Sequence, residues 1–270
     1  MKALLAAILA PALLFASPAA AQGPQPAEGW RITAGAGALF TPAYEGDDDY
    51  RLRLLPNIKI EYGDRFFASV QDGLGYRVIN EESLRVGPIA RIAFARNEDG
   101  SEPFAITGER TTDLIGLGNV ATTAELGAFA EVDFGPLTAG LEARYGVNGH
   151  NGFVADASLR YSGVAQFGGP PLIYSFGPRM TIVGDDYNDA YFSVTPVQSF
   201  ASGLPVFDAD GGVQTVGAGA TAILPLTRRT SLVAVAGYDR FVGDAGDAPL
   251  IRLRGSRNQA TVGVFFGYTF

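Results

Sequence analysis

The segment that decides the fold is Tyr50-Arg-Leu-Arg-Leu-Leu-Pro-Asn-Ile-Lys-Ile-Glu-Tyr62. Its even-numbered positions carry apolar side chains, whereas most odd-numbered positions carry polar ones, among them Arg51, Arg53, Lys59 and Glu61. Because successive side chains of a strand point to opposite faces, this alternation predicts a β-strand. A strand crosses a bilayer at a tilt with about 9–11 residues, so this segment is long enough to span one.

The same alternation returns along the chain and predicts about 12 strands, an even number as in single-chain bacterial barrels. A soluble β-sandwich would alternate in the same way. The length of the strands, the charges opposite the apolar face and the chain end inside a strand at Phe270 favour a transmembrane antiparallel β-barrel, which is all-β. The expected strands are Trp30–Phe40, Tyr50–Tyr62, Phe66–Val78, Leu84–Phe94, Val120–Phe134, Leu137–Val147, Phe153–Tyr161, Leu172–Ile182, Ala190–Val197, Val213–Leu224, Leu232–Val242 and Asn258–Phe270.

The amino end predicts export across the inner membrane. Lys2 precedes the apolar run Ala3–Ala16, and Ala19-Ala20-Ala21 supplies the small residues of a cleavage site. We therefore expect a cleaved signal peptide over residues 1–21, a linker over 22–28 and the barrel over 29–270.

The composition excludes several classes of function. The chain has no cysteine, which excludes a disulfide framework and a thiolate metal site. Its net charge of −8 argues against nucleic acid as a partner.

Several local runs together resemble the MipA/OmpV family of outer-membrane proteins, which is named for an interaction with the lytic transglycosylase MltA. The resemblance implies a barrel in the outer membrane of a Gram-negative bacterium, in contact with lipid and lipopolysaccharide. For the named member it implies a scaffold that joins a murein hydrolase to a murein synthase. The family has no accepted catalytic motif, so no site residue is carried over. The runs are Thr41-Pro-Ala-Tyr-Glu-Gly-Asp47, Tyr62-Gly-Asp-Arg-Phe66, Gly149-His-Asn-Gly152, Asp189-Ala-Tyr-Phe-Ser-Val-Thr195, Ser202-Gly-Leu-Pro205 and Gly243-Asp-Ala-Gly-Asp-Ala-Pro249.

Charged side chains fall on the strand faces opposite the apolar ones, so they are expected to line the barrel interior. They either pair with one another across strands and fill the interior, or form the selectivity charges of a pore. Their near-balanced signs favour a filled, salt-bridged interior. The residues are Arg51, Arg53, Lys59, Glu61, Arg85, Arg91, Glu125, Glu131, Asp133, Glu142, Arg144, Asp156, Arg160 and Arg179.

Loop acids form a second group, with Glu45-Gly-Asp-Asp-Asp49 as its densest run and Asp185, Asp186, Asp244 and Asp247 elsewhere. Clustered carboxylates can hold Ca²⁺ or Mg²⁺. The run lacks the regular ligand spacing of a calcium loop, so we interpret these residues as solvated loop acids and expect neither a metal nor a cofactor. Divalent bridging to lipopolysaccharide is the alternative.

The only histidine, His150, lies in Asn148-Gly-His-Asn-Gly152, a sequence typical of a turn. Barrel hydrolases place a histidine within hydrogen-bond reach of a serine or an aspartate. No His-x-Ser or Asp-x-His pattern adjoins His150. We therefore expect no enzyme activity.

Residues 97–119 are too many for a hairpin turn. If both termini are periplasmic, the strand count places this segment on the periplasmic side, where turns are usually short. Either the strand count is wrong or the segment is a docking surface for a periplasmic murein enzyme. The favoured function is a non-enzymatic scaffold for murein-remodelling enzymes, and the alternative is a narrow diffusion channel or transporter for small solutes.

Overall fold

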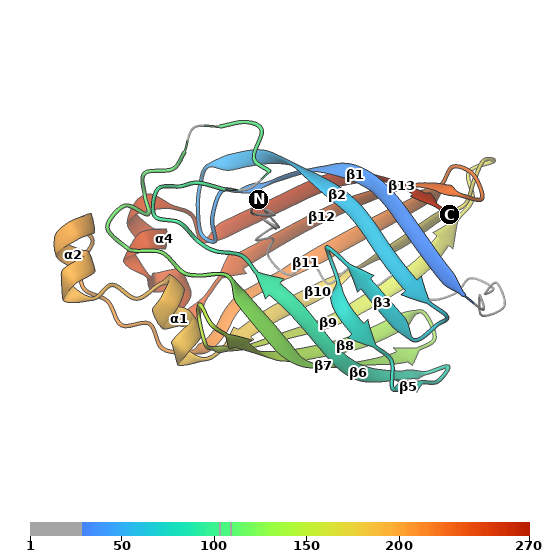
Figure 1. Cartoon of the computed structure of the whole chain (residues 1–270), viewed down its shortest axis with the longest axis horizontal. Coiled ribbons are helices and arrows are strands. Elements are labelled where there is room, and N and C mark those ends of the chain that lie inside the picture. Colours follow the sequence, from blue (N-terminus) through green and yellow to red (C-terminus); the bar gives the residue numbers. More distant parts are fainter. Residues whose placement is uncertain (1–28, 103, 109) are drawn as a thin grey trace, which may run out of the picture.

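The structure, a computed structural model, describes residues 29–102, 104–108 and 110–270 (Figure 1). The predicted signal peptide and linker lie outside the described residues. Most of the described chain is β-strand, and the strands form one antiparallel barrel. The strands are β1 Trp30–Pro42, β2 Tyr50–Tyr62, β3 Phe66–Ser69, β4 Gly73–Tyr76, β5 Ile79–Asn80, β6 Leu84–Ala93, β7 Thr123–Phe134, β8 Leu137–Val147, β9 Phe153–Ala165, β10 Leu172–Val183, β11 Gly212–Pro225, β12 Thr230–Phe241 and β13 Asn258–Thr269.

The barrel closes through two pairings between strands that are distant in the sequence. β1 pairs with β13, from Thr33↔Thr269 to Phe40↔Val262. β4 pairs with β6 and completes the ring, whereas the short β5 only extends the pairing along β6. Without β5, 12 strands close the ring, so the predicted fold class and strand number are confirmed.

Two of the predicted strands are wrong. One contains two strands and the other contains none, so the total number of strands is unchanged. Phe66–Val78 is a hairpin of two strands, because Ser69 and Asp72 form a turn whose next residue, Gly73, has a φ of +79°. Ala190–Val197 is not a strand. It contains the end of α1 and the start of α2, where Thr195 caps the helix and Pro196 occupies its first turn. The helices are α1 Asp185–Tyr191, α2 Pro196–Ser202, α3 Gly243–Asp247 and α4 Pro249–Arg254.

The two ends of the barrel differ in their connections. At the end that carries the carboxy terminus, the strands are joined by residues 63–65, 77–83, 135–136, 166–171 and 226–229. At the other end lie the longer segments 94–122, 184–211 and 242–257, which include all four helices (Figure 1). Bacterial barrels have short periplasmic turns and longer extracellular loops, so we assign the helical end to the cell exterior. We call the two ends the inner end and the outer end.

This arrangement corrects the prediction for residues 97–119. The extra strand in the β3–β4 hairpin changes the strand parity, so of the two stated alternatives the strand miscount is the one observed, and the segment lies at the end opposite the carboxy terminus, which we assign to the exterior. Part of it forms backbone hydrogen bonds with the half of β2 that the short β3 does not reach. Leu54 donates a backbone hydrogen bond to the Phe104 carbonyl (3.1 Å), and Ile106 donates one to the Leu52 carbonyl (2.9 Å). The segment therefore extends the side of the barrel beyond the end of the short β3–β4 hairpin.

Apolar side chains cover the outside of the barrel. Leu54, Leu126, Leu141 and Val262 are each about half exposed and alternate with buried neighbours along their strands. Such a band is what a lipid-facing surface requires.

Aromatic rings gather near both ends of the strands. Trp30 lies 4.9 Å from Tyr62 at the inner end, and Phe40 stacks on Tyr50 at 5.2 Å at the outer end (ring centroids). Rings in these places are typical of the interfacial girdles of outer-membrane barrels. Among the described residues, no α-helix is both long and apolar enough to span a membrane.

Candidate functional site

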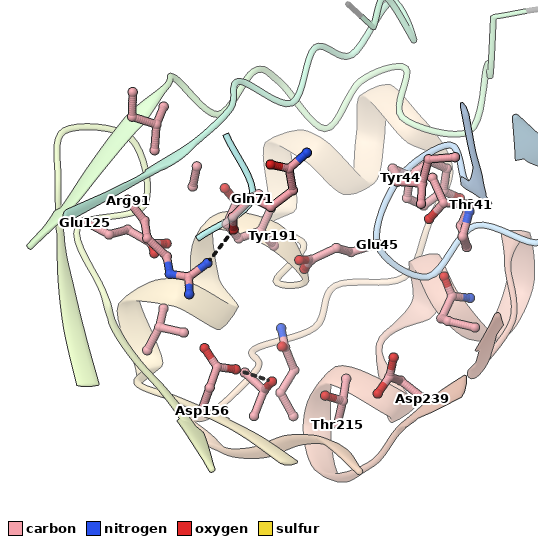
Figure 2. A pocket seen from close by; sticks show the side chains of 18 of the residues that line it. Thr41, Tyr44, Glu45, Gln71, Arg91, Glu125, Asp156, Tyr191, Thr215 and Asp239 are labelled. Carbon is pink, nitrogen blue, oxygen red and sulfur yellow. Dashed lines mark hydrogen bonds between the residues drawn. The ribbon is translucent and has the colours of Figure 1, made fainter. Parts of the chain in front are cut away.

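The interior of the barrel contains a cavity of about 190 Å³ beneath the outer-end segments, which we call the outer chamber. The loop 43–49 and α1 contribute to its lining, together with strands from around the barrel. Figure 2 shows Glu45 projecting into it from the loop, opposite Tyr191 of α1 and with Asp156 and Asp239 on the facing wall. The chamber lining therefore combines charged and aromatic side chains with aliphatic ones such as Leu39, Leu55 and Val154.

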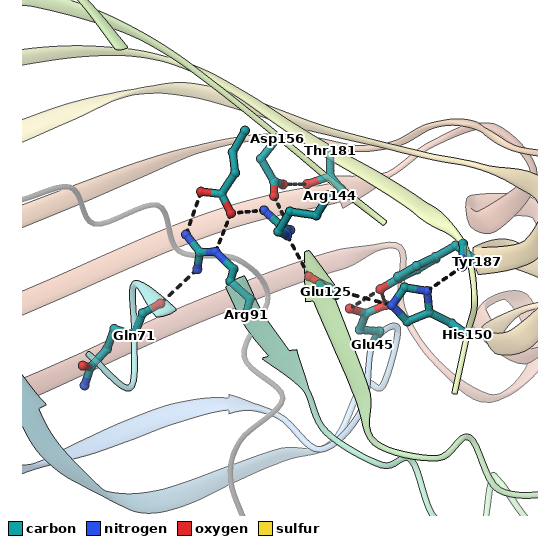
Figure 3. Close-up of polar contacts among 11 residues, drawn as sticks. Glu45, Gln71, Arg91, Glu125, Arg144, His150, Asp156, Thr181 and Tyr187 are labelled. Carbon is teal, nitrogen blue, oxygen red and sulfur yellow. Dashed lines mark hydrogen bonds and ion pairs between the residues drawn. The ribbon is translucent and has the colours of Figure 1, made fainter. Parts of the chain in front are cut away.

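A group of ion pairs centred on Arg144 lines the outer chamber (Figure 3). The buried Arg144 guanidinium on β8 donates to Glu125 Oε2 at 2.7 Å and to Asp156 Oδ2 at 2.8 Å, and it also pairs with Glu142. The antiparallel register places Glu142 directly opposite Asp156. Three carboxylates from β7, β8 and β9 thus converge on one arginine.

Arg91 of β6 extends this group along the same wall, because β6, β7, β8 and β9 are neighbours in the sheet. Its guanidinium binds both oxygens of Glu142, with Nε 2.5 Å from Oε1 and Nη2 2.9 Å from Oε2. Its remaining nitrogen donates to the Gln71 carbonyl at the tip of the β3–β4 hairpin (3.0 Å). We call Arg91, Glu142, Arg144, Glu125 and Asp156 the central belt.

A second cavity, of about 70 Å³, lies on the other side of the Arg91–Glu142 pair. Arg91 lines both cavities, whereas Glu142 lines the second and Asp156 the first. The Arg91–Glu142 pair of the central belt therefore lies between the outer chamber and the inner cavity.

Further charge clusters continue toward the inner end. Arg85 pairs with Glu131 at 3.0 Å and with Asp133 at 2.6 Å, and Arg160 binds the other oxygen of Glu131 at 2.7 Å. The cross-strand register places Arg85 opposite Glu131. Lys59 pairs with Glu61 at 3.1 Å on β2. These clusters make the inner half of the interior salt-bridged as well.

The remaining predicted interior charges find partners that the sequence analysis did not select. Arg53 binds Glu102 Oε2 at 2.6 Å, and Arg51 lies 3.6 Å from Glu102 Oε1. Arg179 pairs with Asp239. Glu102 lies in a loop and has no periodic pattern to reveal it, whereas Asp239 could have been found, because it alternates with Tyr238 and Arg240 on a predicted strand. Every predicted interior charge takes part in an ion pair.

Glu45 differs from the carboxylates of the central belt. The Tyr187 hydroxyl is 3.2 Å from both of its carboxylate oxygens. No Lys or Arg nitrogen of the described residues lies within 4.0 Å of it, and burial raises its pKa to about 7. Burial also raises the pKa of the Tyr187 hydroxyl, which stays protonated and donates to the carboxylate.

His150 is buried at the rim of the central belt (Figure 3). The Gly152 amide donates to its Nδ1 at 3.0 Å, so the ring proton sits on Nε2, which lies 3.1 Å from Glu125 Oε1. Its ring also contacts Tyr187 edge-on at 4.8 Å between centroids. Because both ring nitrogens are engaged, His150 cannot activate a nucleophile in this arrangement.

The loop acids do not come together as one group. Asp185 accepts a hydrogen bond from the Gly211 amide, Asp244 accepts one from the Asp210 amide, and Asp247 pairs with Arg257. In the part of the chain that the structure describes, only Asp47, Asp48 and Asp113 bring three potential metal-ligand side chains close together. The sequence analysis did not select Asp113, because it lies far along the chain from the acidic run.

Solved outer-membrane structures resemble the chain distantly. The COG4313 outer membrane channel from Pseudomonas putida F1 is 13% identical, covering 92% of this chain and 98% of its own, with a TM-score of 0.46. OprB from Pseudomonas putida is 13% identical, covering 82% of this chain and 59% of its own, with a TM-score of 0.38. OprG from Pseudomonas aeruginosa is 11% identical, covering 90% and 96%, with a TM-score of 0.27. These similarities are too low to transfer a function.

No curated protein matches the chain. A family model described as "MltA-interacting protein MipA" matches residues 34–270, which is most of the chain. The family resemblance of the local sequence runs is confirmed. A closed barrel with an apolar outer surface in this family belongs in the outer membrane of a Gram-negative bacterium, as predicted. The protein is a member of the MipA family.

Proposed function

We propose that this protein is a closed outer-membrane barrel that anchors murein-remodelling enzymes at the periplasmic face of the membrane. The central belt supports a closed interior. Arg91, Glu142 and Arg144 join β6 to β8 along one wall of the interior, and the cavities on either side of the Arg91–Glu142 pair share only Arg91 in their lining. A hydrated ion that moves between these two cavities past Arg91 and Glu142 would have to break charge-assisted hydrogen bonds, and such bonds are strong.

The expected partner is a murein-remodelling enzyme in the periplasm. The matching family is described as MltA-interacting protein, and the sequence resemblance implies that its named member joins a murein hydrolase to a murein synthase. We infer that such a partner works on the periplasmic side. A partner there can reach only the short turns of the inner end. Among them, Phe167 in the turn 166–171 is 82% exposed. Exposed aromatic side chains are enriched among the residues that dominate protein–protein binding, so this turn is our candidate anchor point.

Site-specific photocrosslinking in intact cells tests the anchoring role. A photoreactive residue at Phe167 should capture a murein hydrolase or synthase. The matched control is Phe200 on α2, which is 95% exposed but lies at the outer end. The same probe at Phe200 should capture neither enzyme. If Phe167 captures no murein enzyme, or if Phe200 captures the same one, this anchoring model is wrong.

Planar-bilayer recording tests the closed interior. The purified wild-type barrel should show no conductance steps. The double variant Arg91→Ala/Glu142→Ala keeps the net charge and removes the ion pair that lies between the two cavities, so it should conduct. Arg110→Ala, at an exposed ion pair outside the interior, is the control and should stay silent. Conductance steps or solute uptake by the wild type would instead support the alternative function, a narrow channel for small solutes.

A further inference from the structure

Three carboxylates from two distant parts of the chain meet at the outer end. Asp47 and Asp48 lie on the loop 43–49, and Asp113 lies on the segment that follows β6. One oxygen of each lies within 4.8 Å of the others. Within the described residues, no Lys or Arg nitrogen lies within 4.0 Å of any of these carboxylates. Arg254 comes near, but its guanidinium donates to the main-chain carbonyls of Asp113 and Ser202.

Asp47 is buried with one carboxylate oxygen unsatisfied. Its side chain is fully buried, at 0% exposure, and among the described residues its Oδ2 atom has no hydrogen-bond partner. The other oxygen, Oδ1, accepts a hydrogen bond from the Asp49 amide (3.0 Å). Buried polar atoms are nearly always satisfied, and an unsatisfied carboxylate oxygen is costly. The loop backbone is fixed independently by Gln259, whose amide group binds the Gly46 amide and the Asp47 carbonyl.

We propose that Asp47, Asp48 and Asp113 bind a calcium ion, which ties the loop 43–49 to the segment 94–122 over the mouth of the barrel. Carboxylate oxygens are the ligands that Ca²⁺ prefers, and Ca–O distances are about 2.3–2.6 Å. Ligands on opposite sides of one Ca²⁺ ion are thus about 4.6–5.2 Å apart, so a spread of up to 4.8 Å lets all three bind the same ion. Mg²⁺, with Mg–O distances of about 2.0–2.1 Å, requires a tighter set.

The surroundings fit a site that is closed on one side and open on the other. Asp47 is buried and Asp113 is partly buried, whereas Asp48 is exposed and leaves an entry path for the ion and its waters. As a calcium ligand, Asp113 would have a function that is independent of the scaffold function.

Calcium titration of the full-length protein in lipopolysaccharide-free vesicles, after treatment with EDTA, tests this site. Isothermal calorimetry should detect one Ca²⁺ per chain, and Mg²⁺ should bind at least tenfold more weakly. Asp47→Asn and Asp113→Asn should each weaken Ca²⁺ binding at least tenfold. The control Asp186→Asn, at an exposed acid on α1, should leave the affinity unchanged. Absence of saturable binding, or equal affinity in wild type and both cluster variants, would overturn the proposal.

Thermal unfolding gives a second readout that does not depend on measuring affinity. In EDTA, Asp47→Asn should melt at a higher temperature than the wild type, because the substitution removes the repulsion within the cluster. In saturating Ca²⁺ the order should reverse. If Asp47→Asn does not fold, Asp48→Asn provides the same comparison from an exposed position. The same order with and without Ca²⁺ would contradict a calcium site.

Discussion

The central belt and the acidic loop 43–49 both bury carboxylates, but they neutralise them differently. In the belt, Glu125, Glu142 and Asp156 all contact the Arg144 guanidinium, which is held by strands in register. In the loop, Glu45 and Asp47 have no such cation within the described residues. Buried charge is stable only when it is paired, protonated or bound to a metal. The belt is therefore internally balanced, whereas the loop depends on protons or ions from the solvent.

The largest effect is expected from replacing Arg144, the residue at the centre of the central belt, which we call its hub. Arg144→Met should leave three buried carboxylates around an apolar side chain, and removing one partner of a buried ion pair costs about 3–5 kcal/mol. Urea unfolding in lipid vesicles measures this loss of stability. Adding Glu125→Gln and Asp156→Asn to Arg144→Met should recover part of the loss. A loss below about 1 kcal/mol for Arg144→Met alone would show that the belt does not depend on its hub.

A smaller effect concerns pH and the acidic loop. Burial raises the pKa values of Glu45 and Asp47 to about 7, so in this pH range the folded state binds protons more tightly than the unfolded state. Their contribution to stability is therefore greatest at acidic pH and falls as the pH rises to about 7. In EDTA, Glu45→Gln/Asp47→Asn should reduce this fall by on the order of 1 kcal/mol. Unfolding of wild type and variant at pH 4.5, 6 and 7.5 measures the difference, and parallel curves would contradict it.

The smallest effect is expected from an ion pair that is exposed to solvent, in contrast to the buried pairs of the central belt. Arg110 and Asp99 form an ion pair of 3.5 Å with side chains that are 69% and 59% exposed. Exposed pairs contribute about 0–1 kcal/mol, so Arg110→Ala should change the unfolding free energy by less than about 0.5 kcal/mol. A loss comparable to that of Arg144→Met would mean that charge pairing in this barrel does not scale with burial.

The sequence predicts the barrel well, because one face of every long strand must be apolar against lipid. The interior charges follow from the same alternation, and the central belt consists entirely of residues identified in this way. The errors arise where local chemistry overrides alternation. Ser69 and Asp72 turn the chain within a predicted strand, and Pro196 starts a helix within another.

The outer end could not be predicted, because its contacts join segments that carry no periodic signal. Asp113 meets Asp47 only after the segment 94–122 has folded across the barrel mouth. The side of the membrane on which this segment lies depended on the number of strands that precede it. One unrecognised hairpin was therefore enough to reverse the assignment, although the total strand number was correct.

The short β3–β4 hairpin also determines where the wall of the barrel is weakest. The termini are sealed from Thr33↔Thr269 to Phe40↔Val262, whereas β4 meets β6 only at Leu74↔Ala90 and Gly75↔Ile89. A cylinder under lateral tension opens along its least-bonded line, which here is the β4–β6 boundary and not the line where the chain ends meet. We therefore expect backbone amides along this boundary to exchange with solvent deuterium before those of β1 and β13.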